Sequence, residues 1–305
     1  MKKRKITLPW EHPKLEEEDP HSLELIERIM KSPTYAIAET DSAFLNAYET
    51  RGIRLELDYL KAELKMKEYG IEHTIVVFGS ARIVERQTAL KRLEQIEAML
   101  KTQPNSKELL RELQVAERMV SKSIYYDDAR EFGALVGKSG EAVEDCRVTL
   151  MTGGGPGIME AANRGAYDVG AKSIGLNIKL PHEQYPNPYI TPDLCFLFHY
   201  FAIRKLHFLN RAKALVVYPG GFGTFDELFE TLTLIQTEKT DQIPVVFVGK
   251  EYWKKAINFE FLQEEGVIDP QDLDIFYFAD NAHEAWEYIL SWHKEEGRPL
   301  YASQS

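Results

Sequence analysis

The sequence predicts an α/β protein with a doubly wound parallel sheet, and three observations carry this prediction. Short apolar runs recur along the chain, helical patterns lie between most of them, and two glycine-rich segments directly follow such runs. Apolar runs of this length are typical of parallel strands that are buried on both faces. Strands that alternate with helices indicate parallel pairing, because parallel strands need a crossover connection.

The first apolar run, Thr74–Phe78, ends at Gly79 and Ser80 and opens the predicted sheet. The further strands are expected at Val148–Met151, Ser173–Ile178, Leu194–Phe198, Ala214–Tyr218, Val245–Val248 and Ile275–Phe278. The helices expected between and after them cover Met159–Val169, Phe225–Gln236, Tyr252–Glu264 and Ala282–Lys294. Ligands of such sheets bind at the carboxyl ends of the strands, where the loops gather.

Two segments lie outside this alternation. Residues 1–70 form a predicted N-terminal helical extension, with prolines in its first part and one long helix from Asp41 to about Gly70. The main domain covers residues 71–305. Within it, residues from about 85 to 122 are predicted to form an inserted helical hairpin, interrupted at Pro104. A packing element or a dimer contact accounts for the hydrophobic stripes of this insertion better than a regulatory arm does.

Length and composition are those of a globular protein. The chain has 305 residues, of which 44% are hydrophobic and 28% charged. No apolar run approaches the roughly 18 residues of a membrane span. The basic residues 2–5 are followed by acidic residues 16–18 instead of the apolar stretch of a signal peptide, so we expect a cytoplasmic protein. The formal net charge of -11 argues against nucleic acid as a partner.

The cysteines and histidines do not predict a metal site. Cys146 and Cys195 lack the spacing of metal ligands and are too few for a disulfide scaffold. Their apolar surroundings indicate reduced structural thiols. The histidines are scattered along the chain.

The segment Pro219–Thr224 follows a predicted strand and opens a predicted helix. Gly220, Gly221 and Gly223 allow successive N–H groups to converge on an anion, and Thr224 adds a hydroxyl group near the helix start. The segment lacks the Gly-Lys-Ser/Thr ending of a P-loop and the Gly-x-Gly-x-x-Gly spacing of dinucleotide sites, which disfavours ATP hydrolysis and NAD chemistry. We therefore predict that it binds the phosphate group of a nucleotide.

A second glycine segment, residues 152–157, follows the strand that ends at Met151. Gly153, Gly154 and Gly155 precede a helix expected to start near Pro156. Such glycines bring the backbone close to a ligand, or they form only a tight turn. The pattern alone leaves both interpretations open.

We call Pro219–Thr224 the phosphate segment, after its predicted ligand. Three charged residues near it have two interpretations each. Glu227 follows Thr224 at the spacing of a capping box, so it is either a capping residue or a functional carboxylate. Arg204 and Lys205 lie in a predicted helix and either contact an anion or are solvated. The residues of that helix that we expect to pack are Ala202, Leu206 and Leu209.

Together these residues resemble the LOG ("lonely guy") family, often described as lysine decarboxylase-like. The resemblance runs from about Thr74 to about Glu287, outside the insertion, and Arg-Lys followed by Pro-Gly-Gly-x-Gly-Thr-x-x-Glu is its most specific part. The matching segments are Gly79-Ser80, Gly153 to Met159, Leu180-Pro181 with Glu183-Gln184, Arg204-Lys205 and Pro219 to Glu227. The extension and the insertion are similar to those of a longer bacterial branch.

The resemblance implies a Rossmann-like fold, a homodimer or higher homo-oligomer with the site near the subunit interface, and a phosphoribohydrolase that needs no cofactor or metal. Such enzymes cleave the N-glycosidic bond of nucleoside 5′-monophosphates, AMP-like or cytokinin riboside monophosphates, to free base and ribose 5-phosphate. By position, Arg204 and Glu227 would be the catalytic pair. Gly220, Gly221, Gly223 and Thr224 would hold the phosphate group, and the other nucleotide contacts would be Gly79, Ser80, Gly153, Gly154, Gly155, Glu183 and Lys205.

Two other functions compete with hydrolysis. Decarboxylation is disfavoured, because no lysine resembles that of a pyridoxal-phosphate site. A non-catalytic nucleotide-binding or sensing protein of the same fold is the stronger alternative, since a fold alone fixes no activity. The presence of both Arg204 and Glu227 favours the hydrolase.

Overall fold

The computed structural model describes residues 8, 10–15, 17–142, 148–181, 185–297 and 300. The chain divides into two units, Met1–Leu57 and Asp58–Ser305. The first unit contains α1 (Ser22–Met30), the short 3-10 helix η1 (Pro33–Tyr35), α2 (Ser42–Leu45) and the start of α3 (Arg51–Glu68). Among its described residues only Ser22 and Thr50 are buried, so this part of the unit holds no apolar core.

The single long helix expected from Asp41 is wrong, because α2 and α3 are separated by residues 46–50. The Thr50 hydroxyl group lies 2.9 Å from the carbonyl oxygen of Leu45. The Arg54 guanidinium donates to the carbonyl groups of Leu45 and Ala47 at 2.5 and 2.6 Å. These side chains pair carbonyl groups that the end of α2 leaves without helical partners, and this stabilises the break.

The second unit is built on a seven-stranded sheet whose pairs are all parallel, which confirms the predicted fold class. The strand order is β4-β3-β2-β1-β5-β6-β7. Strands β2, β3 and β4 therefore lie on one side of β1, and β5, β6 and β7 lie on the other. Ligands bind at the carboxyl ends of strands where the order reverses in this way. The strands are β1 (His73–Phe78), β2 (Val148–Thr152), β3 (Ser173–Ile178), β4 (Cys195–Phe198), β5 (Ala212–Val217), β6 (Val245–Val248) and β7 (Phe276–Ala279).

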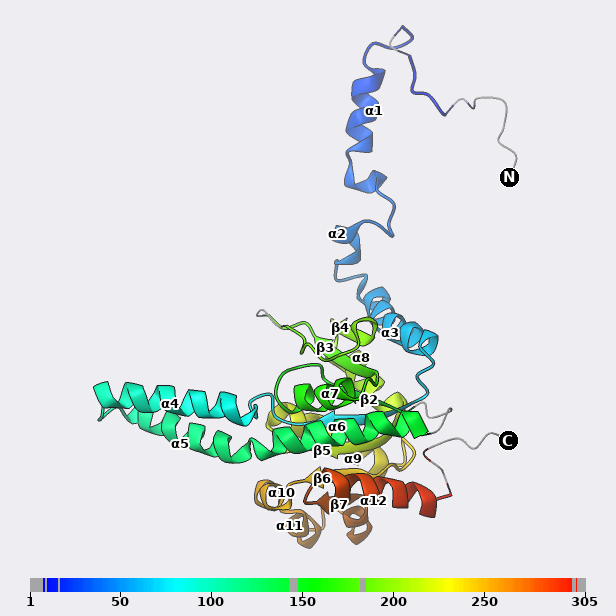
Figure 1. Ribbon diagram of the computed structural model, residues 1–305. Helices are drawn as coiled ribbons and strands as arrows, with labels where there is room; N and C mark the ends of the chain where they lie inside the picture. Colours follow the sequence, from blue (N-terminus) through cyan, green and yellow to red (C-terminus); the bar gives the residue numbers. More distant parts are fainter. Residues whose placement is uncertain are drawn as a thin grey trace. The chain divides into compact units, whose positions relative to one another are not determined.

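Helices cover both faces of the sheet (Figure 1). In β1, Ile75 and Val77 point into one apolar layer, whereas Val76 and Phe78 point into the other, as the alternation of a strand requires. The first layer is covered by α6 (Ile124–Ala142), α7 (Ile158–Asp168) and α12 (Ala282–Glu295). The second is covered by α8 (Phe201–Asn210), α9 (Phe222–Gln236), α10 (Lys250–Ala256), α11 (Phe259–Glu264) and residues Ala62 and Met66 of α3.

The single helix expected over Tyr252–Glu264 is also wrong, because α10 and α11 divide this segment. Ile257 has an extended backbone with φ -138° and ψ 130°. The side chain of Asn258 accepts a hydrogen bond of 3.0 Å from the N–H group of Phe261 and caps the second helix.

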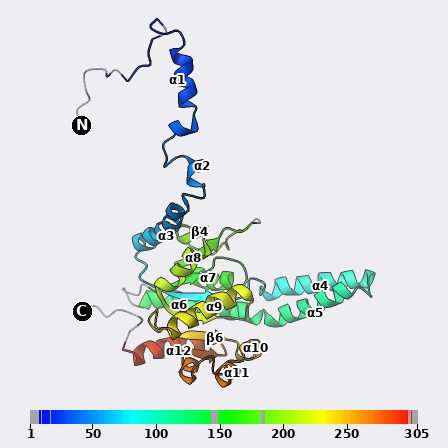
Figure 2. The same cartoon turned by 180° about the vertical axis from the view of Figure 1, so that it is seen from behind.

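The region for which the sequence predicts a helical hairpin forms α4 (Arg86–Thr102) and α5 (Lys107–Lys122). The two helices lie side by side in both views and extend away from the sheet (Figures 1 and 2). Ala89, Ile96 and Ala116 are buried, and an ion pair of 3.2 Å joins Arg92 to Glu112. None of the helices in the described ranges combines the length and the apolarity needed to cross a bilayer.

A partly buried ion pair joins α3 to Arg211, the residue directly before β5, and leads to a first prediction. Arg211 donates to the two carboxylate oxygens of Glu63 at 2.7 and 2.8 Å, and these hydrogen bonds are the main cause that lowers the pKa of Glu63. Glu63→Gln is expected to lower the free energy of unfolding by about 1–2 kcal/mol at neutral pH.

The contribution of Glu63 depends on pH in a known direction. Because its pKa is lower in the folded state, the stabilisation is present above the unfolded-state pKa and is lost as the pH falls through the folded-state value. Urea unfolding of the wild type and of Glu63→Gln at pH 7 and at about pH 3 checks this. An unchanged difference at the acidic pH would contradict the assignment.

Candidate active site

A cavity of about 800 Å³ lies at the carboxyl ends of β1, β2 and β5. The loops after these three strands and the start of α9 form most of its wall, and α7, α8 and α10 complete it. The lining residues are 78–82, 153, 155, 156, 159, 204, 208, 220–225, 227 and 252.

Backbone hydrogen bonds tie the three loops together. The Ser80 N–H group donates to the carbonyl oxygen of Pro219 at 3.0 Å, and the Ser80 carbonyl oxygen accepts from the N–H group of Ile158 at 3.1 Å. Gly79 allows this approach, since a Cβ atom there would lie 2.5 Å from the Ile158 side chain. The helix expected near Pro156 begins at Ile158, after Gly157 with φ +73°. The three loops are therefore joined to one another along one rim of the cavity.

The phosphate segment opens α9, which begins at Phe222 with Gly221 as its N-cap residue. The first helical hydrogen bond after the cap is made by the N–H group of Phe225 to the carbonyl oxygen of Gly221, at 3.0 Å. The N–H groups of residues 222–224 precede it at the helix terminus, and these residues line the cavity. A helix terminus of this kind attracts anions such as phosphate.

The glycines of this segment differ in what surrounds them. A Cβ atom at Gly220 would lie 2.1 Å from the hydroxyl oxygen of Thr224, so packing within the protein requires this glycine. A Cβ atom at Gly221 or Gly223 would meet nothing within 4 Å among the described residues. Both border the cavity, so close approach of a ligand explains them better than packing does.

This difference predicts opposite effects of one substitution on stability and on binding. Gly223 lies in the first turn of α9 and has no positive φ, so alanine fits its backbone. Gly223→Ala is expected to raise the free energy of unfolding by up to about 1 kcal/mol, because glycine is the poorer helix former. The added methyl group is expected to weaken nucleotide binding. Thermal unfolding and titration calorimetry with AMP test the two effects, and unchanged affinity would contradict a ligand at this position.

Arg204 and Glu227 form an ion pair in the cavity wall. Arg204 Nη2 lies 3.0 Å from Glu227 Oε1, and the exposed fractions of the two side chains are 13% and 7%. The guanidinium lies 5.0 Å from the ring centre of Phe201 and 5.4 Å from that of Phe208. Arg204 Nε is buried and has no hydrogen-bond partner within the described part of the chain. The guanidinium is thus held in place, and its Nε is unpaired among the described residues.

The carboxyl group of Glu227 is a weaker acid than an exposed glutamate, because it is buried. Loss of solvent raises the pKa of its carboxyl group, while the positive charges of Arg204 and Lys205 act in the opposite direction. The capping-box interpretation is wrong, because Gly221 is the N-cap residue and Thr224 is already the third residue of α9. A buried carboxylate with a raised pKa in a cavity is typical of functional sites.

The packing face expected for α8 is wrong at Ala202 and Leu206, whereas Leu209 is partly buried. Ala202 and Leu206 are exposed, whereas His207 and Phe208 are buried. Aromatic contacts from outside the helix decide this: Tyr59 stacks on His207 with ring centres 5.0 Å apart, and Phe78 packs edge-on against Phe208.

The structure brings most of the predicted site residues to this cavity. Three of them are placed elsewhere or not described. Lys205 Nζ lies 2.8 Å from the carboxylate of Asp226 and 2.9 Å from that of Glu230, and Lys205 does not line the cavity. Gly154 does not line it either, and with φ +71° it packs against Asn177. Glu183, and likewise Cys146, lie outside the described residues. The residues that do line the cavity are Gly79, Ser80, Gly153, Gly155, Arg204, Gly220, Gly221, Gly223, Thr224 and Glu227.

Sequence reasoning missed several residues of the site. Arg82, Phe208 and Tyr252 line the cavity. Asn187 fixes the second glycine segment, because its side-chain amide donates to the carbonyl oxygen of Gly155 at 3.1 Å. The sequence could have indicated Tyr252, because this residue follows β6 closely and β6 pairs with β5, whose loop lines the cavity.

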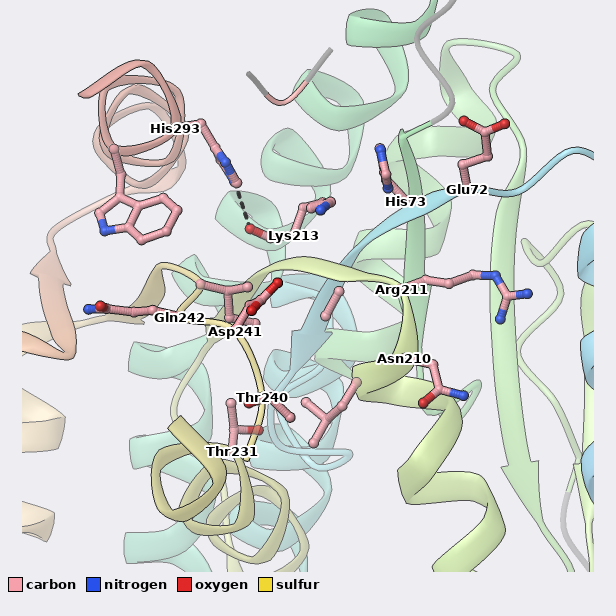
Figure 3. Close-up of a pocket in the computed structure, with 14 residues that line it drawn as sticks. Glu72, His73, Asn210, Arg211, Lys213, Thr231, Thr240, Asp241, Gln242 and His293 are labelled. Atoms are coloured by element: carbon pink, nitrogen blue, oxygen red, sulfur yellow. Dashed lines mark hydrogen bonds between the residues drawn. The ribbon is translucent and has the colours of Figure 1, made fainter. Parts of the chain in front are cut away.

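A second cavity, of about 420 Å³, lies at the opposite edge of the sheet, at the amino ends of β1 and β5. Figure 3 shows His73, Lys213 and His293 beside it, and the ring Nε2 of His293 lies 2.8 Å from the carbonyl oxygen of Lys213. No glycine segment lines this cavity. The larger cavity is therefore the candidate active site. Within the described ranges, no group of His, Cys, Asp and Glu side chains is gathered as a metal site would require.

The chain is similar to one protein-family model and to two curated plant proteins. A family model with the description "Possible lysine decarboxylase" matches residues 159–289. Probable cytokinin riboside 5'-monophosphate phosphoribohydrolase LOG4 of Oryza sativa subsp. japonica is 28% identical over 158 residues, which are 50% of this chain and 67% of that protein. Cytokinin riboside 5'-monophosphate phosphoribohydrolase LOG3 of Arabidopsis thaliana is 29% identical over 169 residues, 53% of this chain and 73% of that protein.

A solved structure is similar at a lower level. The molybdenum cofactor binding protein from the phototrophic bacterium Rippkaea orientalis has a TM-score of 0.40 and 20% identity, covering 55% of this chain and 87% of its own.

The match of the family model includes the whole of α8 and α9, which carry Arg204 and Glu227. The family model and the curated relatives therefore support the assignment of the chain to the LOG family, the lysine decarboxylase-like proteins that include the cytokinin riboside 5'-monophosphate phosphoribohydrolases.

Proposed function

We propose that this protein hydrolyses the N-glycosidic bond of nucleoside 5′-monophosphates and releases the free base and ribose 5-phosphate. One observation carries the proposal: a buried carboxylate, Glu227, lies 3.0 Å from Arg204 in the wall of the cavity that also contains the start of α9. A helix terminus suited to a negative phosphate group and a carboxylate suited to developing positive charge therefore border the same cavity. The names of the plant relatives support the same reaction class.

The proposed reaction needs a negative group beside the ribose ring. As the bond from C1′ to the base breaks, the base leaves with the electron pair and positive charge builds on C1′ and O4′. The Glu227 carboxylate would stabilise this charge. Water then adds to C1′, one of its protons goes to solvent or to the carboxylate, and the departing base gains a proton. Activation of water by Glu227 and a transient covalent adduct are both compatible with this position.

The phosphate group would position the substrate. The N–H groups of residues 222–224 and the hydroxyl group of Thr224 would hold it at the positive end of the helix dipole. Arg204 would then use its free donors for the phosphate or for a ribose hydroxyl group. Lys205, Gly154 and Glu183 remain predicted nucleotide contacts. The proposed chemistry uses no cofactor.

We also propose that the active form is a homodimer or a higher homo-oligomer, acting in the cytoplasm. Apolar side chains on α8 and α9 support a partner surface beside the site, because Phe201, Leu206, Phe222 and Phe229 are exposed by 50%, 45%, 97% and 38%. Sedimentation analysis of the wild type and of Leu206→Glu measures this. A monomeric wild type would contradict the proposal.

Base release from a panel of substrates tests the proposed reaction. Purified protein is incubated with the common nucleoside 5′-monophosphates, N6-modified AMP and the matching nucleosides, and free base is quantified by chromatography. Release from the monophosphates but not from the nucleosides is the expected result, and the relative rates identify the preferred base. Binding of monophosphates without release of base would favour the non-catalytic nucleotide-binding protein instead.

A further inference from the structure

The peptide unit between Gly220 and Gly221 has an unusual anchor. The Tyr252 hydroxyl group donates a hydrogen bond of 2.5 Å to the carbonyl oxygen of Gly220. Tyr252 belongs to α10, which follows β6, and its side chain also borders the candidate active site. A residue far along the chain thus fixes the orientation of one peptide unit in the phosphate segment.

This peptide unit needs such an anchor because glycine flanks it on both sides. Rotation of a peptide plane by half a turn changes ψ of the preceding residue and φ of the following one, and glycine tolerates both changes. In a trans peptide the C=O group and the next N–H group point in opposite directions. If the Gly221 N–H group faces a bound anion, rotation of the peptide by half a turn would present the Gly220 carbonyl oxygen to that anion instead. An anion favours the N–H group and is repelled by the carbonyl oxygen.

Tyr252 is itself held firmly by its neighbour. The Trp253 indole N–H group lies 3.2 Å from the carbonyl oxygen of Val217 and 3.1 Å from that of Val248, and these residues end β5 and β6. Trp253 is completely buried. Burial raises the pKa of the Tyr252 hydroxyl group, which keeps it protonated as a donor. The anchor is therefore fixed to the sheet that carries the phosphate segment.

We propose that Tyr252 is a positioning residue that holds the Gly220–Gly221 peptide in the orientation that binds a phosphate monoester. The inference rests on the proposed function for the location of the phosphate group. It adds a residue that acts through the backbone of the segment. Loss of the hydroxyl group should weaken phosphate-bearing ligands selectively, because ligands without phosphate do not use this peptide.

Tyr252→Phe tests the proposal, since it removes only the hydroxyl group. Calorimetry with ribose 5-phosphate and with AMP is expected to give dissociation constants about tenfold above those of the wild type, the size of one lost hydrogen bond. Adenine and adenosine should bind as they do to the wild type. In the base-release assay, KM for AMP should rise by a similar factor while kcat changes less than about twofold, because the chemical groups are untouched.

Two further variants separate the hydroxyl group from general packing. Tyr277→Phe is the matched control, because its hydroxyl group makes a 2.7 Å hydrogen bond to Glu284 and lies outside the cavity lining. It should bind all ligands as the wild type does. Tyr252→Leu removes the ring as well, so a loss confined to this variant would assign the effect to packing and overturn the proposal. Equal weakening of AMP and adenosine in Tyr252→Phe would also overturn it.

Calorimetry keeps this test separate from the reaction. If the wild type binds ribose 5-phosphate but releases no base, the proposed hydrolysis fails, and Tyr252→Phe still decides the role of the hydroxyl group. If the wild type binds neither ribose 5-phosphate nor AMP, no phosphate group is held by this segment, and the inference about Tyr252 fails with it.

Discussion

Glu227→Gln is expected to slow base release from nucleoside 5′-monophosphates about a thousandfold and to leave their binding within a few fold of the wild type. The amide keeps the size of the side chain and can still accept a hydrogen bond from Arg204, 3.0 Å away. It carries no negative charge to stabilise the positive ribose of the transition state. Single-turnover rates of base release and calorimetric affinities for AMP measure the two effects separately.

Glu230→Gln is the matched control for this experiment. Glu230 lies on the same helix, is also paired with a cation, Lys205 at 2.9 Å, and does not line the cavity. Its substitution should change the rate of base release less than about twofold. Equal losses in both variants would place the effect in the packing of α9 and contradict a chemical role for Glu227.

The acidity of Glu227 adds a pH dependence in a defined direction. Burial raises its pKa above the ordinary value for glutamate, which is about 4.3. If the carboxylate form is the active one, base release falls as the pH drops through this raised value. The acidic limb of the rate profile should therefore lie at a higher pH than an exposed glutamate would give. An acidic limb at the ordinary value would contradict a buried carboxylate in the reaction.

The sequence was sufficient for the sheet and for most of the cavity. Val245–Val248 and the Ile75–Phe78 part of β1 are continuous apolar runs, since a strand covered by helices on both faces carries few polar residues. The glycine segments stand directly after such runs. In a parallel sheet this brings Gly79, Gly153 and Gly220 to one edge. The short distance in sequence between strand and glycine makes this inference possible.

The features that could not be predicted from the sequence depend on contacts between segments that are distant in the chain. Thr50 and Arg54 end α2 through side-chain hydrogen bonds that no helical pattern reveals. The buried face of α8 is decided by Tyr59 and Phe78, which belong to other elements. Tyr252 reaches Gly220 only because β6 pairs with β5. Periodicity reports the local structure of a segment, whereas these contacts require knowledge of which elements are neighbours.

Arg204→Met is expected to lower the free energy of unfolding by about 3 kcal/mol at neutral pH, because it leaves the buried Glu227 carboxylate without its partner. Methionine keeps an apolar stem beside Phe201 and Phe208, so the loss reports the charge more than the packing. Base release should fall together with stability, since the same guanidinium is proposed to orient the nucleotide.

The pH dependence and a double substitution identify the cause of this loss. Without Arg204 the folded-state pKa of Glu227 rises further above the unfolded-state value, so the folded protein binds the extra proton and the destabilisation shrinks as the pH falls through that range. Arg204→Met combined with Glu227→Gln should recover about half of the lost stability at neutral pH, because no charge is then buried alone. Urea unfolding of the four proteins measures the coupling. Additive losses would mean that the two side chains stabilise the fold independently, and the 3.0 Å contact would then contribute nothing to it.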